Sequence, residues 1–517
     1  MKARLPSIQT IAGFDGQGIE CGLWSSQTGR TKQAIILLGD RRCRDSLGLK
    51  TWASGLIHRL DMPDAMALTP DLGQARLEHA PHALEAVFNH LRDTYGLQAR
   101  DIVLIGHGLG ASRAAVFTHD HAPNLASLIL DGLRFASLSL ADRRVMHRVL
   151  RDAPAIIAPT LMLTSRNPLE RDYAAQKRLA DGLQSRVTTR DKRPNNQRDL
   201  AQSMSRFIRD CADIGDDQTQ DLLKADQAGY TAQEYDRLRQ PLPWYNPKAW
   251  YWQASRVGLR LASSLSQGIR LGQIKGFDSG AMLDYVYRNE ARGLGPIGRQ
   301  IDRQYINALG WRGIRQRKTH LEQLLVATNQ RLSKAGMPTR LLDIAAGHGR
   351  YIIDAVQQFG TPATRVQLRD FDPHNVADGR ALLQHRGLDD IARFDQGDAF
   401  DAADLAGLYQ PGDKATLSVV SGLYELFPEN EPVRQSLAGV AAATEQHGYL
   451  VYTGQPWHPQ LEMIARALTS HRGGQAWAMR RRTQAEMDQL VREAGFEKLT
   501  QRTDPWGIFT VSLARKL

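Results

Sequence analysis

Acidic residues and glycines recur at the ends of apolar segments in the last third of the chain. One such segment ends at Asp343 and runs into Gly347 and Gly349, and the next ends at Asp370. Glycines let a backbone approach a ligand closely, and a helix that begins beside them presents free N–H groups. The carboxylate of Asp370, just over twenty residues after the glycine turn, is placed to accept hydrogen bonds from two ribose hydroxyls. The spacing therefore predicts a nucleoside site.

The next two apolar segments extend this site. Asp398 offers a carboxylate for an adenine amine and Ala399 a backbone N–H for a ring nitrogen, while the fourth segment ends in residues 421–425. Gly-x-Gly also begins the dinucleotide fingerprint, whose third glycine packs the helix against the strand. Ile352 stands at that place, so an NAD site is disfavoured.

These residues need a parallel sheet to bring them together, because the carboxyl ends of parallel strands meet at one edge. From about residue 336 the chain alternates apolar strand-like runs with helical patterns, and its last two runs predict a hairpin. The ordered series resembles class I S-adenosylmethionine-dependent methyltransferases, which have a seven-stranded sheet with an antiparallel last strand. The resemblance implies Asp343 and Gly347 at the methionine part of S-adenosylmethionine, Asp370 at the ribose, and Asp398 with Ala399 at the adenine. The full set of implied cofactor residues is Asp343, Ala345, Gly347, Gly349, Asp370, Phe371, Asp398, Ala399 and Ser421.

Candidates for the acceptor side lie on the loops after the fourth and fifth strands. They are Tyr424, Glu425 and His458, and for each of them packing or solvent exposure is an equal alternative. The sulfonium of such a cofactor carries its own activation, so alignment of the acceptor and exclusion of water matter more than a dedicated base. The arginines of residues 477–482 are expected either to clamp an anionic acceptor or to form a solvated edge.

The first 213 residues show another alternation of apolar strands and amphipathic helices, which predicts a mainly parallel sheet covered on both faces. At residues 106–110 a strand passes into a helix through Gly-His-Gly-Leu-Gly. This turn resembles the nucleophile elbow of the α/β-hydrolase fold, Gly-x-Ser-x-Gly, and lies in the strand–turn–helix context that the elbow requires. The resemblance implies an α/β-hydrolase-like domain over roughly the first 210 residues.

The catalytic residues of a hydrolase are missing from this domain. Gly108 stands at the nucleophile position, and no histidine occurs between His147 and His320. Asp131, a candidate acid, is then expected to have no histidine to orient, and His107 is expected to be packed or bonded to backbone. Acyl transfer needs a nucleophile and a base within hydrogen-bond reach. We therefore predict a non-hydrolytic scaffold or binding module.

The segment between the two domains, residues 214–335, is helical, aromatic and basic. Residues 241–320 contain thirteen Lys/Arg and four Asp/Glu, a balance of +9 out of +11 for the whole chain. Trp and Tyr gather at 244–252 beside arginines, a pattern typical of an amphipathic helix at a membrane surface. Residues 241–276 are thus a candidate for peripheral membrane contact, and a packed aromatic core with solvated arginines is the alternative. The helices after residue 279 can form a lid over the acceptor site or cover a sheet edge.

Nucleic acid is a less favoured partner of this basic segment. Arginines interleaved with aromatic residues can bind single-stranded RNA. No RNA-binding motif string is present, so RNA is disfavoured, and DNA is not an expected partner.

Length and composition set the remaining limits. The chain has 517 residues, 42% hydrophobic and 23% charged, and no run of ~20 apolar residues that would predict a transmembrane helix. Its start has no apolar h-region, and three scattered cysteines provide neither a disulfide framework nor a zinc site. We expect a cytoplasmic α/β protein without a metal, at most peripheral at the inner face of the membrane, with domains at 1–213, 214–335 and 336–517.

The chain as a whole resembles predicted bacterial fusions of an α/β-hydrolase-like domain with a methyltransferase. The leading hypothesis is methyl transfer to a small, apolar or lipid-like acceptor, with a partner domain that does not hydrolyse esters. Two alternatives stay open: a bifunctional hydrolase–methyltransferase, and an S-adenosylmethionine-binding regulator or scaffold without turnover. Gly108 and the missing histidine disfavour the bifunctional enzyme. The regulator stays open, because a methyltransferase needs no catalytic base, and so the sequence contains no residue whose absence would distinguish it from a regulator.

Overall fold

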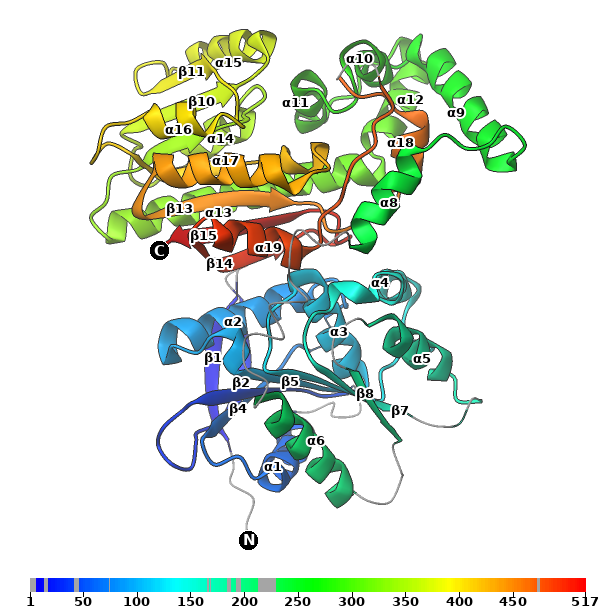
Figure 1. Ribbon diagram of the computed structural model, residues 1–517, viewed down its shortest axis with the longest axis vertical. Coiled ribbons are helices and arrows are strands. Elements are labelled where there is room, and N and C mark those ends of the chain that lie inside the picture. The colour runs from blue at the N-terminus through cyan, green and yellow to red at the C-terminus, as the bar shows by residue number, and fades with distance from the viewer. Residues whose placement is uncertain are drawn as a thin grey trace. The chain divides into compact units, whose positions relative to one another are not determined.

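The computed structural model describes residues 6–13, 17–40, 46–73, 75–164, 167, 169–183, 187–191, 197–212, 229–471 and 475–517. The chain divides into two compact units, residues 1–224 and 225–517, and each is built on its own sheet (Figure 1). Cys43 and the boundary expected at residue 213 lie outside the described residues. The described helices that the sequence assigns to a connector fall in the second unit, together with the second sheet.

The first unit contains an eight-stranded sheet in the order β1-β2-β4-β3-β5-β6-β7-β8. The pairs β1/β2 and β2/β4 are antiparallel, and all later neighbours are parallel. The prediction of a mainly parallel sheet is confirmed. The strands are β1 (Ser7–Ala12), β2 (Gly18–Trp24), β3 (Gln33–Leu38), β4 (Ala65–Pro70), β5 (Ile102–His107), β6 (Ser127–Asp131), β7 (Thr160–Thr164) and β8 (Val187–Asp191).

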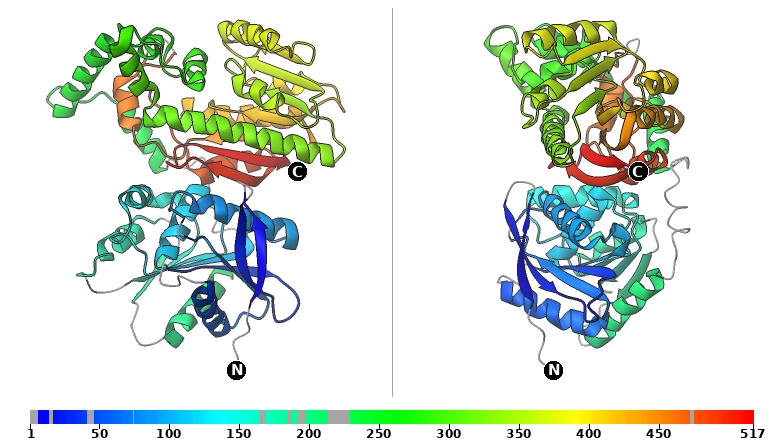
Figure 2. Two further views of the ribbon diagram at one scale, coloured as in Figure 1. Left: turned by 180° about the vertical axis from the view of Figure 1, so that it is seen from behind. Right: turned by 90° about the vertical axis from the view of Figure 1, so that its left-hand side faces the viewer.

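Helices cover both faces of this sheet (Figure 2). Successive side chains of a strand point to opposite faces, and those of β3 accordingly enter two separate cores. Ile36 packs in the core beneath the second to fifth helices, whereas Ile35 packs in the core beneath the first and sixth. These helices are α1 (Ser46–Leu60), α2 (Ala80–Tyr95), α3 (Leu109–His121), α4 (Leu140–Arg151), α5 (Tyr173–Gly182) and α6 (Gln197–Ala212).

The second unit contains a seven-stranded sheet in the order β11-β10-β9-β12-β13-β15-β14. Strands β9 to β13 are parallel, and β15 runs antiparallel between β13 and β14. The seven-stranded sheet with an antiparallel last strand is therefore confirmed. Its strands are β9 (Arg340–Asp343), β10 (Arg365–Asp370), β11 (Ala392–Gln396), β12 (Ala415–Val420), β13 (Thr444–Gly454), β14 (Phe496–Thr503) and β15 (Thr510–Lys516).

Two helical layers and a further group of helices surround this sheet (Figures 1 and 2). One face packs against α13 (Leu309–Lys334), α14 (Arg350–Val356) and α15 (Pro373–His385). The other packs against α16 (Ala402–Gly407), α17 (Asn430–Ala443) and α19 (Gln484–Glu493). A separate apolar core joins the start of α13 to a group of shorter helices. That group comprises α8 (Tyr230–Arg239), α9 (Pro247–Ser263), α10 (Gln267–Lys275), α11 (Gly280–Arg288), α12 (Gly295–Ile306) and α18 (Leu461–Ala467).

Candidate functional site

A cavity of about 800 Å³ lies at the carboxyl ends of β9, β10, β11 and β12, beside α11. Open α/β sheets bind their ligands in this position, and the volume is that of a ligand site. All but one of the cofactor residues expected from the sequence line the cavity. They are Ala345, Gly347, Gly349, Asp370, Phe371, Asp398, Ala399 and Ser421.

Two glycines shape the turn between β9 and α14. Gly347 and Gly349 have φ values of 59° and 71°, in the left-handed region that favours glycine. A Cβ on Gly349 would lie 2.8 Å from Leu368 Cδ1, so this position has no room for a side chain. The nearest atom to a Cβ on Gly347 would be Gly280 Cα, at 3.6 Å. The turn thus presents bare backbone to the cavity.

Three N–H donors hold the carboxylate of Asp370 at the end of β10. Its Oδ2 accepts from Gly347 N at 2.8 Å, and its Oδ1 accepts from Asp372 N and Asn375 Nδ2, both at 3.0 Å. A carboxylate offers about four lone-pair positions, so one on Oδ2 is left for a ligand hydroxyl. The expected contact with two ribose hydroxyls would require one of the present bonds to open.

The remaining cavity residues follow the ends of β10, β11 and β12. Asp398 Oδ1 accepts from Phe400 N at 2.9 Å, and Ala399 is buried beside it. Phe371 is largely exposed and lines the cavity. Ser421 is buried, and its hydroxyl has no hydrogen-bond partner within the described part of the chain. Buried polar groups are rarely left unpaired, so a ligand that bonds to this hydroxyl would be favoured.

Asp343 lies behind the cavity wall and is fully buried. Tyr351 Oη donates to its Oδ2 at 2.5 Å, and Ala345 N donates to its Oδ1 at 3.3 Å. Burial raises the pKa of Asp343 to about 7, although both hydrogen bonds act to lower it. The structure therefore shows Asp343 supporting the glycine turn, whereas the resemblance implies a direct contact with the ligand.

A second cavity, of about 150 Å³, adjoins the first. The two cavities share wall residues, which are Asp278, Leu283, Arg317, Gly422 and Leu426. The other walls of the second cavity are mainly apolar and include Tyr305, Trp311, Trp477 and Phe509.

Two of the three expected acceptor-side residues meet in the second cavity. Glu425 and His458 both line it, and both are buried. Tyr424 lines neither cavity: its ring packs in the core between the sheet and α17, and its Oη lies 3.0 Å from Ser436 Oγ. The structure thus brings Glu425 and His458 together and separates Tyr424 from them.

Arg317, which the sequence analysis did not single out, lies in the wall between the two cavities. Its Nη1 is 3.4 Å from Glu425 Oε1, and its guanidinium lies over the Phe509 ring at 5.0 Å. Burial lowers the pKa of Arg317, but Tyr287 and Glu425 outweigh burial and raise it. A charged guanidinium is thus held where the two cavities meet.

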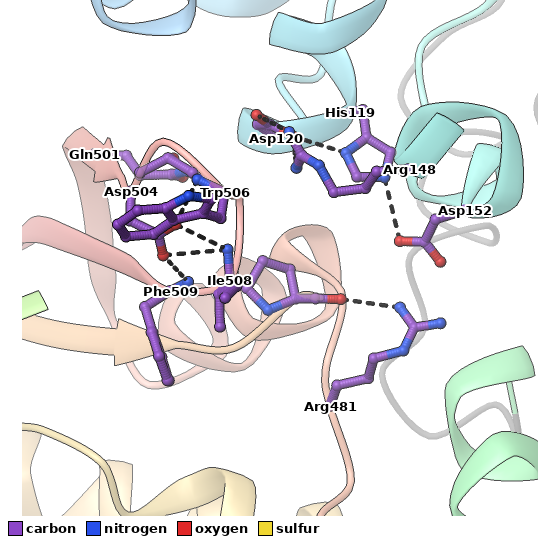
Figure 3. Close-up of polar contacts among 12 residues, drawn as sticks. His119, Asp120, Arg148, Asp152, Arg481, Gln501, Asp504, Trp506, Ile508 and Phe509 are labelled. Carbon is purple, nitrogen blue, oxygen red and sulfur yellow. Dashed lines mark hydrogen bonds and ion pairs between the residues drawn. The ribbon is translucent and has the colours of Figure 1, made fainter. Parts of the chain in front are cut away.

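The arginines expected to form a clamp or a solvated edge are buried. Arg482 donates to the carbonyl oxygens of Tyr424 and Phe427 at 2.6 and 2.9 Å. Arg481, drawn in Figure 3, donates to Pro456 O at 2.9 Å. The solvated-edge interpretation is therefore wrong, because these guanidinium groups are used to fix the loops after β12 and β13.

The turn that resembles a hydrolase elbow lies between β5 and α3 of the first unit. Gly108 has a φ of 59°, and a Cβ there would lie 2.5 Å from Asp40 Cγ. Leu109 N donates to Asp40 Oδ1 at 3.4 Å, and Arg134 Nη2 donates to Asp40 Oδ2 at 3.3 Å. A carboxylate therefore fills the space that a nucleophilic side chain would need.

His107 and Asp131 form a pair that the sequence analysis did not expect. They are register partners at the ends of β5 and β6, and His107 Nδ1 lies 2.6 Å from Asp131 Oδ2. The expectation that Asp131 has no histidine to orient is wrong. Ser112 cannot serve the pair as a nucleophile in this arrangement, because its hydroxyl donates to Arg134 O at 2.7 Å.

A buried charge cluster ties α3 to α4 in the first unit (Figure 3). His119 Nδ1 lies 2.8 Å from Asp120 Oδ1, and its Nε2 lies 3.2 Å from Asp152 Oδ2. Arg148 Nη2 donates to Asp120 Oδ2 at 2.9 Å. Burial lowers the pKa of His119, but its bonds with the two aspartates outweigh burial and raise it. The charged form of the His119 imidazole is therefore favoured, and the four side chains form a buried ion cluster. The sequence contains no signal for this cluster.

Aromatic side chains are exposed on α9 and just before it. Trp244 is 80% exposed and Trp250 is 67% exposed, and Tyr245 and Tyr251 are exposed beside them. No residue of α9 is buried. These four rings are therefore not part of a core, which was the alternative reading of the sequence.

The described residues contain neither a candidate membrane-spanning helix nor a candidate metal site. Among them, no helix is both long and apolar enough to cross a membrane. The same residues contain no group of three or more His, Cys, Asp or Glu side chains arranged to hold a metal ion.

The fold and the site define an α/β protein with two parallel-dominated sheets, the second of them with a ligand cavity at its carboxyl strand ends. The chain belongs to the family described as "Putative methyltransferase", whose model matches residues 204–516, more than half of the chain. It is 38% identical over 484 residues to the uncharacterized protein YnbC of Escherichia coli strain K12, covering 80% of this chain and 81% of YnbC.

Two solved structures are similar to parts of the chain. An exported protein candidate from Bordetella parapertussis is 16% identical with a TM-score of 0.41, and the match covers 55% of this chain and 93% of that one. An O-methyltransferase family protein from Burkholderia thailandensis is 13% identical with a TM-score of 0.30, and the match covers 46% of this chain and 82% of that one.

Proposed function

We propose that residues 225–517 form a methyltransferase that uses S-adenosylmethionine and acts on a small, apolar acceptor. The observation that carries the proposal is the pair of adjoining cavities, one lined by Asp370, Asp398 and the glycine turn, the other lined by apolar side chains. Family membership supports methyl transfer as the reaction.

The residues of the larger cavity fit this cofactor. Asp370 keeps one lone-pair position for a ribose hydroxyl, and Ser421 offers an unpaired hydroxyl. The carboxylate of Asp398 would accept from the adenine amine, and the bare turn at Gly347 leaves space for the methionine part. When bound, the cofactor supplies an activated methyl group. The protein's own part is then to orient the acceptor and to exclude water.

Calorimetric titration with S-adenosylmethionine tests the cofactor assignment. Asp370→Ala removes a carboxylate that would be hydrogen-bonded to the ligand, which costs about 1.5–3 kcal/mol, or at least about tenfold in affinity. Asp389→Ala is a matched control, because Asp389 is an exposed aspartate that does not line the cavity. Equal affinities for the wild type and Asp370→Ala, or no binding by the wild type, would refute the assignment.

Turnover separates an enzyme from a regulator that only binds S-adenosylmethionine. A methyltransferase transfers a radiolabelled methyl group from S-adenosylmethionine to an extract of small apolar metabolites. A regulator binds the cofactor and leaves the label in it. Label transferred by the wild type and not by Asp370→Ala supports the enzyme.

For the first unit we propose an α/β-hydrolase-like domain without hydrolase activity. Support comes from the mainly parallel eight-stranded sheet and the sharp turn at Gly108 between β5 and α3. The carboxylate of Asp40, which faces this turn and accepts from Leu109 N, argues against acyl transfer. The bifunctional alternative is disfavoured on the same ground.

We also propose that α9 and the residues before it contact membranes. The four exposed aromatic rings supply apolar surface, and Arg256, Arg260 and Arg270 are exposed nearby. Trp and Tyr suit the headgroup region of a bilayer, and basic residues are attracted to anionic lipid. Such contact would bring the acceptor cavity to an amphiphilic substrate.

A further inference from the structure

The second cavity is apolar, yet several N–H groups of its wall residues have no acceptor. Gln455 Nε2, Trp477 Nε1 and Arg317 Nε are all buried, and none has a hydrogen-bond partner in the part of the chain that is described. All three side chains line the cavity and are at least nine-tenths buried. Burying an unpaired N–H group is unfavourable, so a ligand in the cavity whose oxygen atoms these side chains can turn toward would be favoured here.

His458 adds a fourth donor to this cavity. Its Nδ1 accepts from Gln460 N at 3.1 Å. Burial lowers the pKa of His458 to about 4, so the ring is neutral at physiological pH. A neutral imidazole whose Nδ1 accepts carries its proton on Nε2. His458 can therefore donate from Nε2, and this tautomer has no basic nitrogen left to take a proton from the acceptor.

Arg317 and Glu425 offer a donor and an acceptor side by side in the shared wall. Their closest atoms are 3.4 Å apart, which is long for a charge-assisted hydrogen bond. A ligand hydroxyl fits such a pair, because its oxygen can accept from Arg317 while its proton is donated to Glu425. A methyl group in the same place would leave both charged groups without that contact.

The charges of the cavity disfavour a cationic acceptor. Arg317 is positive, His458 is neutral, and the carboxylate of Glu425 is already paired with Arg317. The other acidic residue of the wall, Asp278, accepts from Ser470 Oγ at 2.6 Å and is therefore engaged. An ammonium group would find no unpaired carboxylate here.

We propose that the second cavity binds a small, aromatic, largely apolar molecule that carries a hydroxyl group and a second oxygen acceptor such as a carbonyl. The hydroxyl binds between Arg317 and Glu425, where the cavities meet, and the second oxygen binds among Gln455, His458 and Trp477, which line only the second cavity. The flat walls that Trp311 and Phe509 contribute suit an aromatic ring. This inference rests on the proposed function, since it names the acceptor class of the same site.

Four matched benzene derivatives test the proposal on the full-length protein. They are 4-hydroxyacetophenone, 4-isopropylphenol, 4-methylacetophenone and 4-isopropyltoluene, which present both groups, the hydroxyl only, the carbonyl only and neither. Their affinities are measured by ligand-observed NMR titration without S-adenosylmethionine. We expect the hydroxyketone to bind at least about tenfold more tightly than the hydrocarbon, with the other two between them. Equal or tighter binding of the hydrocarbon, or no binding of any of the four, would overturn the proposal.

A glutamine variant locates the binding and separates a ligand-binding role from a structural one. Gln455→Met should lower the affinity for 4-hydroxyacetophenone about three- to tenfold, the range of one hydrogen bond. It should leave 4-isopropylphenol unchanged. Because Gln455 Nε2 loses no partner, the same variant should keep or raise the melting temperature.

Gln501→Met is the matched control for stability. Gln501 is equally buried, donates to Thr503 Oγ1 at 2.9 Å and accepts from Lys498 Nζ at 2.6 Å. Its replacement should lower the melting temperature by about 2 °C or more. A comparable loss with Gln455→Met would show that Gln455 has a structural role and would count against the proposal.

The two binding measurements distinguish a wrong acceptor class from a wrong cofactor assignment. If S-adenosylmethionine binds and the four compounds do not follow the expected order, the proposed function stands and the acceptor class is wrong. If the order is found and S-adenosylmethionine does not bind, the cavity assignment stands and the cofactor assignment is wrong.

Discussion

Replacing Asp343 by asparagine should stabilise the protein at pH 8 and change it little near pH 4. Burial raises the pKa of this carboxyl from 3.8 to about 7 in the folded state. Between these two values the folded protein keeps a proton that the unfolded chain releases. Stability therefore falls as pH rises from about 4 to about 7 and then levels off. The shift corresponds to at most roughly 4 kcal/mol, and asparagine, which resembles the protonated carboxyl, escapes this loss.

Thermal unfolding from pH 4 to pH 8 measures the effect. At roughly 2–4 °C per kcal/mol for a domain of this size, the melting temperature of Asp343→Asn relative to wild type should rise by several degrees across this range. Asp389→Asn, at an exposed site, should show no such trend. If Asp343→Asn is less stable than wild type at pH 8, the ionised carboxylate is stabilised in the turn and the reasoning from burial is wrong.

Three further predictions concern other parts of the chain. A fluorophosphonate probe should label no serine in residues 1–213, because Gly108 has no side chain to react, and stable labelling there would disprove the non-hydrolytic assignment. In flotation assays the protein should bind anionic liposomes at low salt and leave them at high salt, and joint replacement of Arg256, Arg260 and Arg270 by Gln should abolish binding; wild type that stays soluble at low salt would contradict the membrane proposal. Tyr424→Phe should leave the affinity for 4-hydroxyacetophenone unchanged and cost about 1 kcal/mol of stability for the lost hydroxyl bond, whereas a tenfold loss of that affinity would place Tyr424 at the acceptor site.

The two sheets could be predicted because strand and helix periodicity is local. The positions of Asp370 and Asp398 could be predicted from the same pattern. A residue at the carboxyl end of a parallel strand lies at the ligand-binding edge of the sheet, whatever its neighbours are. The burial of Asp343 did not follow. In the structure Tyr351, a residue of the next helix, donates a hydrogen bond to this buried carboxyl, a contact that the strand and helix pattern does not predict.

Two features that the sequence analysis missed had a signal in the sequence. His107 and Asp131 end consecutive strands, and parallel pairing of these strands places the two residues side by side. Arg317 stands three residues after Ile314 and four before Leu321, which puts it on the apolar face of α13. The sequence analysis included Arg317 in the charge balance of the basic segment and did not consider its place on this face. The unpaired donors of Gln455 and Trp477 had no such signal, because they arise only where separate loops meet.

The placement of Arg317 joins the basic segment to the proposed chemistry. An arginine on the apolar face of a long helix would be unfavourable unless a charge and hydrogen bonds compensated its burial. Tyr287 and Glu425 compensate the burial of the guanidinium, but Arg317 Nε has no partner in the described structure. A guanidinium that is incompletely paired in the free protein gains a further contact when a ligand oxygen accepts from it beside Glu425. Arg317 is thus held where binding of the acceptor relieves an existing cost, which would favour hydroxyl-bearing molecules over hydrocarbons of the same shape.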